Sequence, residues 1–332
     1  MDYDEKLLRL IAFSNLKGIG AVMVKKSLDG DSLFGNNIFA DLKNAAFVNN
    51  KSFNDSDIDD SLHFAEQVIK KCDYERIEIL TLIDPDYPVL LKGIKNPPPI
   101  IYYKGNKKLF QSKAIAIIGT REPNENGKKI AERIGEYYGN AGFQICNGLS
   151  VGIDSEAIKD NMSLNKGVIG VMAGGLNFQT SKTLSKFNLN NALKNIEANG
   201  LIISECPPDK KEDTFTVVKS CRIQAGLSSA VIVVQSSING GTRFAVRAFC
   251  ETNRPIAVVN PIDADFESLE YEANKELVIN GKRGLGKFTE IKNEKMLRDP
   301  FIIKSKNDYS KFRELIDSEE LMQKTRSNTL FD

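Results

Sequence analysis

Residues 115–121 have the sequence IAIIGTR, an apolar run that ends at a glycine before a polar segment. The same pattern recurs at residues 145–154 (ICNGLSVGID) and 231–242 (VIVVQSSINGGT). A helix N-terminus exposes unpaired amides and a partial positive charge, and glycine lets a phosphate approach the backbone because it has no Cβ. Three such turns after apolar strands predict an α/β fold with a polyanion site at one sheet edge.

Apolar segments alternate with amphipathic segments from about residue 77 onward. We expect strands at residues 114–118, 143–146, 168–172, 201–204, 230–234 and 255–259. Apolar residues at helical spacing predict helices at residues 127–138, 153–161, 189–198 and 242–251. This alternation is typical of a parallel sheet with helices on both faces, so we predict a Rossmann-like, doubly wound, mostly parallel sheet.

Residues 1–75 have a different pattern, which predicts a small all-helical N-terminal domain of the helix-hairpin-helix or SAM-like kind. We expect helices at residues 5–13, 21–28 and 61–71 and a polar loop at residues 49–60. Residues 16–20 (LKGIG) form the hairpin turn, and its glycines free backbone amides that suit a DNA phosphate. A tight turn that binds nothing explains the same residues equally well.

The Rossmann-like domain is predicted at residues 76–285, and residues 286–332 are predicted to form a lysine-rich C-terminal extension. This extension either adds a basic surface or is a solvated tail with one helix near residues 310–323. Its pattern does not indicate a winged helix.

The composition is that of an ordinary globular protein, with 41% hydrophobic residues and a formal net charge of +1. Nucleic-acid binding therefore requires a local basic patch. The five cysteines include no C-x-x-C pair, and most of them are expected to be reduced core thiols. A lone histidine, His63, disfavours a histidine-based metal site or catalytic triad. No apolar run approaches the roughly 18 residues of a membrane span, and the first residues are acidic, so we expect a cytoplasmic protein that does not bind membranes.

The turn at Gly119 does not have the G-x-G-x-x-G spacing of a dinucleotide site. Arg121 instead places a planar fork of donors beside the helix start, which suits a phosphate. The alternative role of Arg121 is a surface ion pair. Asp154, at the start of the next predicted helix, is expected to cap that helix or to brace the turn.

Several blocks, taken in order, resemble the DNA-processing proteins of the DprA/Smf family. Residues 86–91 (DYPVLL) and 102–106 (YYKGN) look like the family's entry into its sheet domain. The later matches to family motifs are residues 118–121 (IGTR, similar to Val-Gly-Ser-Arg), 147–154 (NGLSVGID, similar to Ser-Gly-x-Ala-x-Gly-Ile-Asp), 204–207 (SECP, similar to Ser-Glu-x-Pro) and 222–228 (RIQAGLS, similar to Arg-Ile-Ile-Ala-Gly-Leu-Ser). Each block is short, so the resemblance depends on their order over roughly residues 5–285.

The resemblance implies a non-enzymatic protein, with no cofactor and no metal, that binds and protects single-stranded DNA. It also implies a homodimer that helps to load a RecA-type recombinase in DNA recombination or in the natural transformation of competent cells. The matching blocks place the single-stranded DNA site at Gly119, Thr120, Arg121, Asn147, Gly148, Ser150, Gly152, Lys182, Arg222, Gly240, Gly241 and Thr242. Such a groove binds strands with little sequence preference and strong salt dependence.

The chain departs from the family pattern at part of this site. The family's Arg-Asn-Arg is Ser220-Cys221-Arg222 here, so the sequence leaves open whether this part still binds single-stranded DNA. The family's Tyr-Pro-Lys is Thr180-Ser181-Lys182 here, and the additional residues that follow make Lys186 a rival of Lys182 for the lysine that meets the DNA backbone.

Two other classes of function stay open. Residues 240–242 (GGT) also resemble SLOG-like nucleotide-binding sensors, including sensors in phage defence, and phosphoribohydrolases related to lysine-decarboxylase-like proteins. The hydrolase motif is Pro-Gly-Gly-x-Gly-Thr-x-x-Glu, whereas residues 237–242 (SINGGT) do not have the additional glycine and residues 244–246 (FAV) do not have the glutamate, which disfavours hydrolysis. A structural or partner-docking protein with an empty Rossmann-like site is the third possibility.

Overall fold

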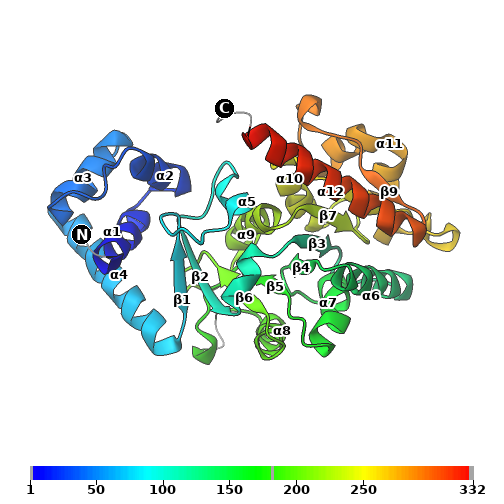
Figure 1. Cartoon of the computed structure of the whole chain (residues 1–332), viewed down its shortest axis with the longest axis horizontal. Helices are drawn as coiled ribbons and strands as arrows, with labels where there is room; N and C mark the ends of the chain where they lie inside the picture. The colour runs from blue at the N-terminus through cyan, green and yellow to red at the C-terminus, as the bar shows by residue number, and fades with distance from the viewer. Residues whose placement is uncertain (1–2, 181–182, 329–332) are drawn as a thin grey trace. The chain divides into compact units, whose positions relative to one another are not determined.

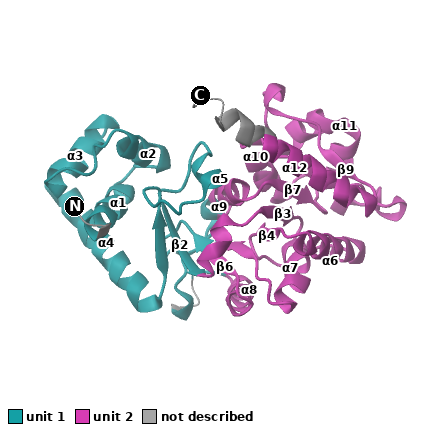
Figure 2. Cartoon of the chain, viewed as in Figure 1, with its two compact units in different colours: residues 1–104, 172–184, 203–216 teal, residues 105–171, 185–202, 217–332 magenta. Residues whose placement is uncertain are grey.

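The computed structural model describes residues 3–180 and 183–328 of the chain. It divides into two compact units (Figure 2). Unit 1 comprises Met1–Lys104, Met172–Leu184 and Ile203–Thr216, and unit 2 comprises Gly105–Val171, Ser185–Ile202 and Val217–Asp332. Unit 1 therefore extends past residue 75, the boundary that we expected for the first domain.

Unit 1 begins with the helices α1–α4, drawn in blue to cyan in Figure 1. Their bounds are α1 (Tyr3–Asn15), α2 (Ala21–Asp29), α3 (Ile38–Val48) and α4 (Asp55–Glu75). The three predicted helices are confirmed, and α3 is additional. The predicted loop at residues 49–60 is wrong in its second half, because Asn54 caps α4 and forms a reciprocal capping box with Asp57.

The same unit continues with an antiparallel pair of strands, β1 (Glu78–Thr81) and β2 (Ile100–Gly105), which the short helix α5 (Val89–Lys92) separates in sequence. The Tyr87 hydroxyl donates a hydrogen bond of 2.8 Å to the Pro98 carbonyl and thereby closes this connection. Residues 86–91, the first block of the family resemblance, thus lie between β1 and β2.

The strands of unit 2 form a parallel sheet. Their order is β5 (Ile169–Val171), β4 (Gln144–Asn147), β3 (Ala114–Ile118), β7 (Ala230–Val233), β8 (Ile256–Val259) and β9 (Phe301–Ile303), and each neighbouring pair is parallel. With β6 (Leu201–Ser204), the strand order of the whole sheet is β1-β2-β6-β5-β4-β3-β7-β8-β9. The six predicted strands are confirmed to within one residue at each end.

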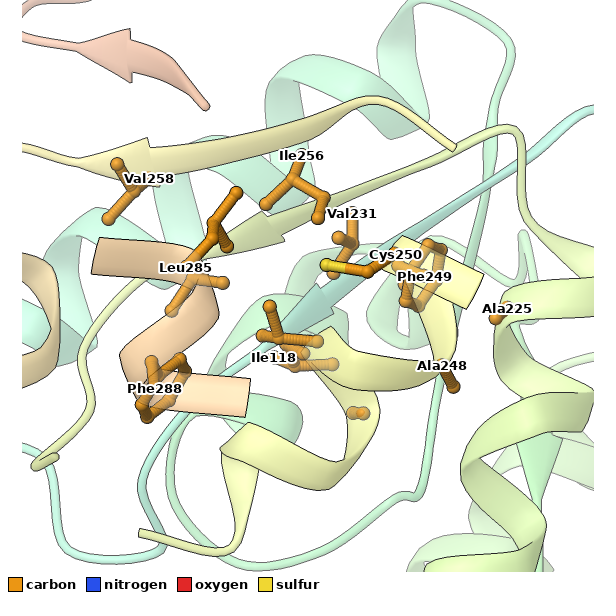
Figure 3. Close-up of a cluster of buried hydrophobic side chains, with 14 of the residues drawn as sticks. Ile118, Ala225, Val231, Ala248, Phe249, Cys250, Ile256, Val258, Leu285 and Phe288 are labelled. Carbon is orange, nitrogen blue, oxygen red and sulfur yellow. The ribbon is translucent and has the colours of Figure 1, made fainter. Parts of the chain in front are cut away.

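Helices cover both faces of this sheet. Their bounds are α6 (Glu125–Asn140), α7 (Ile153–Ser163), α8 (Lys186–Glu197), α9 (Thr214–Leu227), α10 (Thr242–Glu251), α11 (Glu272–Thr289) and α12 (Asn307–Asn328). A buried cluster joins alternate residues of β3, β7 and β8 to α10 and α11, and it includes Phe249 of α10 and Phe288 of α11 (Figure 3). Ile115 and Ile117 are also buried and point to the opposite face, where α6 and α7 contact β3. The doubly wound, mostly parallel prediction is confirmed.

The C-terminal residues continue this unit. We expected an extension after residue 285, but β9 pairs with β8 and thereby lengthens the sheet. α12 follows β9, and the Tyr138 hydroxyl of α6 donates a hydrogen bond of 3.0 Å to the Tyr309 carbonyl of α12. Residues 301–312 are therefore part of the packed unit.

Two general expectations concern the whole described chain. Each of the five cysteines is buried and reduced, as predicted for most of them. Among the described helices, none combines the length and the hydropathy that a membrane span requires.

Candidate functional site

The carboxyl ends of three neighbouring strands meet in unit 2. β3 pairs in parallel with β4 on one side and with β7 on the other, so the three glycine turns lie at one edge of the sheet, as predicted. The chain passes from β3 to β4 and β5 on one side and returns to β7 on the other. The crevice between β3 and β7 is therefore the topological switch point, where open α/β sheets bind ligands.

The turn after β3 packs closely against its neighbours. A Cβ on Gly119 would lie 2.6 Å from Cγ1 of Ile153 and 2.7 Å from the carbonyl oxygen of Gln235, so only glycine fits there. The Thr120 amide donates to the Gln235 carbonyl at 2.8 Å, and the Thr120 carbonyl accepts from the Ile153 amide at 3.1 Å. This turn thus joins the ends of β3 and β7 to the start of α7.

Arg121 is the exposed cation of this turn. Its guanidinium forms no hydrogen bond or ion pair with any of the residues that the structure describes, so the surface ion-pair alternative has no support there. A solvated guanidinium at a switch point has all five of its N–H donors available for a phosphate.

The turn after β4 is braced from inside. Asn147 is fully buried: its Nδ2 donates to the Asp154 carbonyl at 3.0 Å, and its Oδ1 accepts from the Leu149 amide at 3.0 Å. Leu149 has a φ of 54°, and Asn191 of α8 donates to its carbonyl at 3.0 Å. Asn147 was predicted as a DNA contact, but the structure places its side chain inside the turn, where it is shielded from solvent.

Asp154 confirms its predicted role as the brace of this turn. Its Oδ2 accepts hydrogen bonds from the Gly148 amide at 3.2 Å, the Ser150 amide at 3.4 Å and the Ser150 hydroxyl at 2.8 Å. The amides of Gly148 and Ser150, which we expected to hold a phosphate, are therefore already occupied by a carboxylate in this structure.

Burial raises the pKa of Asp154 from 3.8 to about 6, although the bonds from Ser150 and Gly148 and the charge of Arg121 oppose the shift. The folded state therefore binds a proton more readily than the unfolded state between these two pH values. The free energy of unfolding should consequently fall as the pH rises through this window.

We expect Asp154→Asn to remove this pH dependence. The stability of the wild type relative to the variant should decline by up to about 1 kcal/mol per pH unit between about pH 4 and pH 6. Urea denaturation at a series of pH values measures the difference. Asp160→Asn, on the same helix, is the matched control: the stability of the wild type relative to this variant should not decline over the same pH range. An equal decline relative to both variants would contradict the role of Asp154 as the brace.

The turn after β7 leaves its helix end open. The Gly240 amide donates to the Ser237 carbonyl at 3.1 Å, whereas Gly241, the exposed N-cap of α10, has no side-chain cap. Thr242 is the first helical residue and is partly exposed. Arg243, which we did not predict, lies beside it, with its guanidinium 4.9 Å from the Phe244 ring centre and 3.6 Å from Glu290.

The two remaining predicted cations differ in what the structure gives. Arg222 lies half-buried on α9, and its Nη1 donates to the Lys219 carbonyl at 2.7 Å. On the same helix, the Nε2 atom of Gln224 lies 3.7 Å from the position of a Cβ on Gly148, so α9 borders the second turn. Burial raises the pKa of the Cys221 thiol to about 12, which makes it unreactive.

Lys182 lies outside the described residues, and its rival Lys186 is exposed at the start of α8.

The helix that follows the first turn is capped by residues that the sequence did not reveal. Asn124 Oδ1 accepts from the Gly127 amide at 2.8 Å, and the side chain of Gln235, which is fully buried after β7, accepts from the Asn124 amide at 3.2 Å. Neither α7 nor α10 has a side-chain cap, but the N-cap of α7, Gly152, is buried, whereas the N-cap of α10, Gly241, is exposed.

A family model described as DNA recombination-mediator protein A matches residues 78–294, which is more than half of the chain. The chain belongs to this family. The match begins at β1 and ends after α11. It therefore includes all three turns of the edge described above.

Curated relatives of this family member include Protein Smf of Synechocystis, which is 29% identical over 74% of this chain and 62% of its own length. DNA processing protein DprA of Bacillus subtilis is 29% identical over 55% of this chain and 60% of its own length. The chain thus spans less than two thirds of these relatives.

Solved structures support the fold. DprA from Streptococcus pneumoniae is similar with a TM-score of 0.66 and 20% identity, covering 92% of this chain and 95% of the other. DprA from Helicobacter pylori is similar with a TM-score of 0.52 and 24% identity, covering 62% of this chain and 88% of the other.

Proposed function

We propose that the chain binds single-stranded DNA along the carboxyl edge of the unit 2 sheet and does not cut it. The observation that carries this proposal is Arg121: an exposed guanidinium that forms no hydrogen bond or ion pair with a described residue and lies just after β3 at the switch point. A phosphodiester accepts bonds from such a planar fork and gains about 1.5–3 kcal/mol from a charge-assisted contact.

The other elements of the edge support a grip on the sugar-phosphate backbone. The uncapped start of α10 at Gly241 and Thr242 offers amides to a second phosphate, and Arg222 lies on the helix that borders the second turn. The amides of the second turn already donate hydrogen bonds to Asp154, so this turn borders the proposed site without donating to a phosphate. These contacts recognise phosphate and leave the bases free, so little sequence preference is expected.

The comparisons support the same class of ligand. The solved Helicobacter pylori protein is described by a single-stranded DNA binding mode, and the family description is that of a recombination mediator. We infer that a recombinase receives the bound strand and that two copies of the chain act together. In this proposal the protein performs no chemistry on DNA, since Asp154, the buried carboxylate of the second turn, serves as a brace.

A binding comparison tests the proposal. Fluorescence anisotropy of the full chain should show tight binding to a labelled oligothymidylate, weaker binding to a duplex of equal length and little competition by nucleoside monophosphates. Affinity should fall with salt, by a slope of about 0.7 for each phosphate contacted. Tight binding of a free nucleotide with release of its base, or equal affinity for duplex DNA, would contradict the proposal.

A further inference from the structure

An acidic segment lies between the end of β8 and the start of α11. We call residues 260–271 the strap; its acidic members are Asp263, Asp265, Glu267 and Glu270. At its first residue, the Asn260 amide donates to the Ile303 carbonyl at 2.9 Å. Just beyond its last residue, the fully buried Asn274 accepts from the Ser236 amide and donates to the carbonyls of Val234 and Val259, each at 2.9 Å. The strap is thus fixed to β9 at its first end and beside the end of β7 at its last.

The strap places carboxylates at the switch point. Asp265 Oδ1 accepts from Asn124 Nδ2 at 3.1 Å, and Asp265 Oδ2 accepts from Asn126 Nδ2 at 2.9 Å. A weaker contact of 3.4 Å joins Glu270 to the side chain of Gln235. Gln235 also accepts from the amides of Thr120 and Asn124, on either side of Arg121. The strap therefore occupies side-chain amides within a few residues of the proposed phosphate contact.

Asp265 has the form of an internal phosphate substitute. Its two oxygens accept one bond each from two amides, which is how two oxygens of a phosphodiester bind a pair of donors. Its negative charge also opposes the arrival of a DNA phosphate at Arg121, since like charges repel at this range. A strand that passes over the switch point must overcome this carboxylate.

Few other contacts hold the middle of the strap. Leu269 and Ile262 are 77% and 46% exposed, so they bury little apolar area. The Lys275–Glu267 pair, with 2.6 Å between Nζ and Oε2, has a mostly exposed carboxylate and adds little. Pro261 and Tyr271 are buried at the two ends of the strap, so the part that opens at small cost in free energy is residues 262–270, where Phe266 is half-buried with its ring centre 4.8 Å from Lys275 Nζ.

We propose that the strap competes with single-stranded DNA for the carboxyl edge, which rests on the proposed function. Asp265 holds the side-chain amides of Asn124 and Asn126 in the free chain, and a phosphodiester replaces it when the strand binds. Asn124 and Asn126 are thereby further DNA contacts, and the strap lowers the affinity of the chain for single-stranded DNA.

Paired substitutions test the competition in the full chain. We expect Asp265→Asn to bind a labelled oligothymidylate at least about threefold more tightly than wild type, because it removes the competing charge. Asp263→Asn, which removes the same charge two residues away, should change the affinity much less. Adding Asn126→Ala to Asp265→Asn should reverse the gain, since it removes a phosphate donor.

Hydrogen–deuterium exchange supplies a second readout. Exchange of residues 261–271 in the wild type should increase when oligothymidylate is added, because the strap is released. Equal affinities of Asp265→Asn and Asp263→Asn, or a strap that DNA protects, would overturn the competition while the proposed function stands. Absence of binding by the wild type and by all variants would overturn the proposed function and the competition together.

Discussion

Gly152→Ala is expected to lower the free energy of unfolding by about 3 kcal/mol or more. Gly152 has a φ of 88°, where an L side chain is strained. A Cβ there would also lie 2.6 Å from the Arg121 carbonyl oxygen and still closer to the Thr120 carbonyl oxygen. Both atoms are backbone, so the first and second turns would have to separate. Urea denaturation measures the loss.

Gly142→Ala is the matched control, because Gly142 has the same φ of 88° but nothing within 4 Å of the added Cβ. It should cost only the backbone strain, about 1–2 kcal/mol. The difference between the two variants isolates the packing of the turns against each other. Equal losses would show that the turns are not in close contact.

Arg121→Ala is expected to weaken the binding of single-stranded DNA by about tenfold, since it removes a charge-assisted contact with a phosphate. The plot of log affinity against log salt should flatten by about 0.7 for each phosphate lost. The free energy of unfolding should barely change, because the exposed side chain forms no hydrogen bond or ion pair with a described residue and its charge is only the last of the influences on Asp154.

Arg247→Ala is the control for charge. Arg247 is exposed on α10, where its Nε is 3.1 Å from Glu251 on the next helical turn. Removing it lowers the net charge by the same amount but should leave the affinity and the salt slope close to wild type. If the two variants weaken binding equally, the effect of Arg121 is one of overall charge and the switch point does not hold the strand.

Much of the sheet could be predicted because its strands are nearly continuous apolar runs. Ala114–Ile118 and Ala230–Val233 are buried along their whole length, which is typical of parallel strands covered on both faces. The shared edge of the three turns followed from this, since parallel strands end on one side.

Other elements carried weaker signals. β9 has only three residues. α9 is buried on most of its surface, including Cys221, Ile223 and Ala225, so the apolar residues of this helix show little helical spacing. The start of α4 is a run of Asn, Asp and Ser, and its composition hid a capping box.

The hydrogen bonding of the site was the least predictable part. Asp154 lies four to six residues after Ser150 and Gly148, whose amides donate hydrogen bonds to its carboxylate. Only the fold of the turn brings these groups together. Asn124, Gln235 and Asp265 come from three segments of the chain, so no local motif connects them. The sequence could predict which turns share an edge but not which of their amides are already bound.

The central claim is that a DNA strand lies over the ends of β3, β4 and β7. A crystal structure of the chain with a short oligothymidylate tests it directly. We expect a phosphate within hydrogen-bond distance of the Arg121 guanidinium and the Asp265 carboxylate displaced from Asn126. DNA on another surface, with Arg121 in solvent and Asp265 still bound to Asn124 and Asn126, would contradict it.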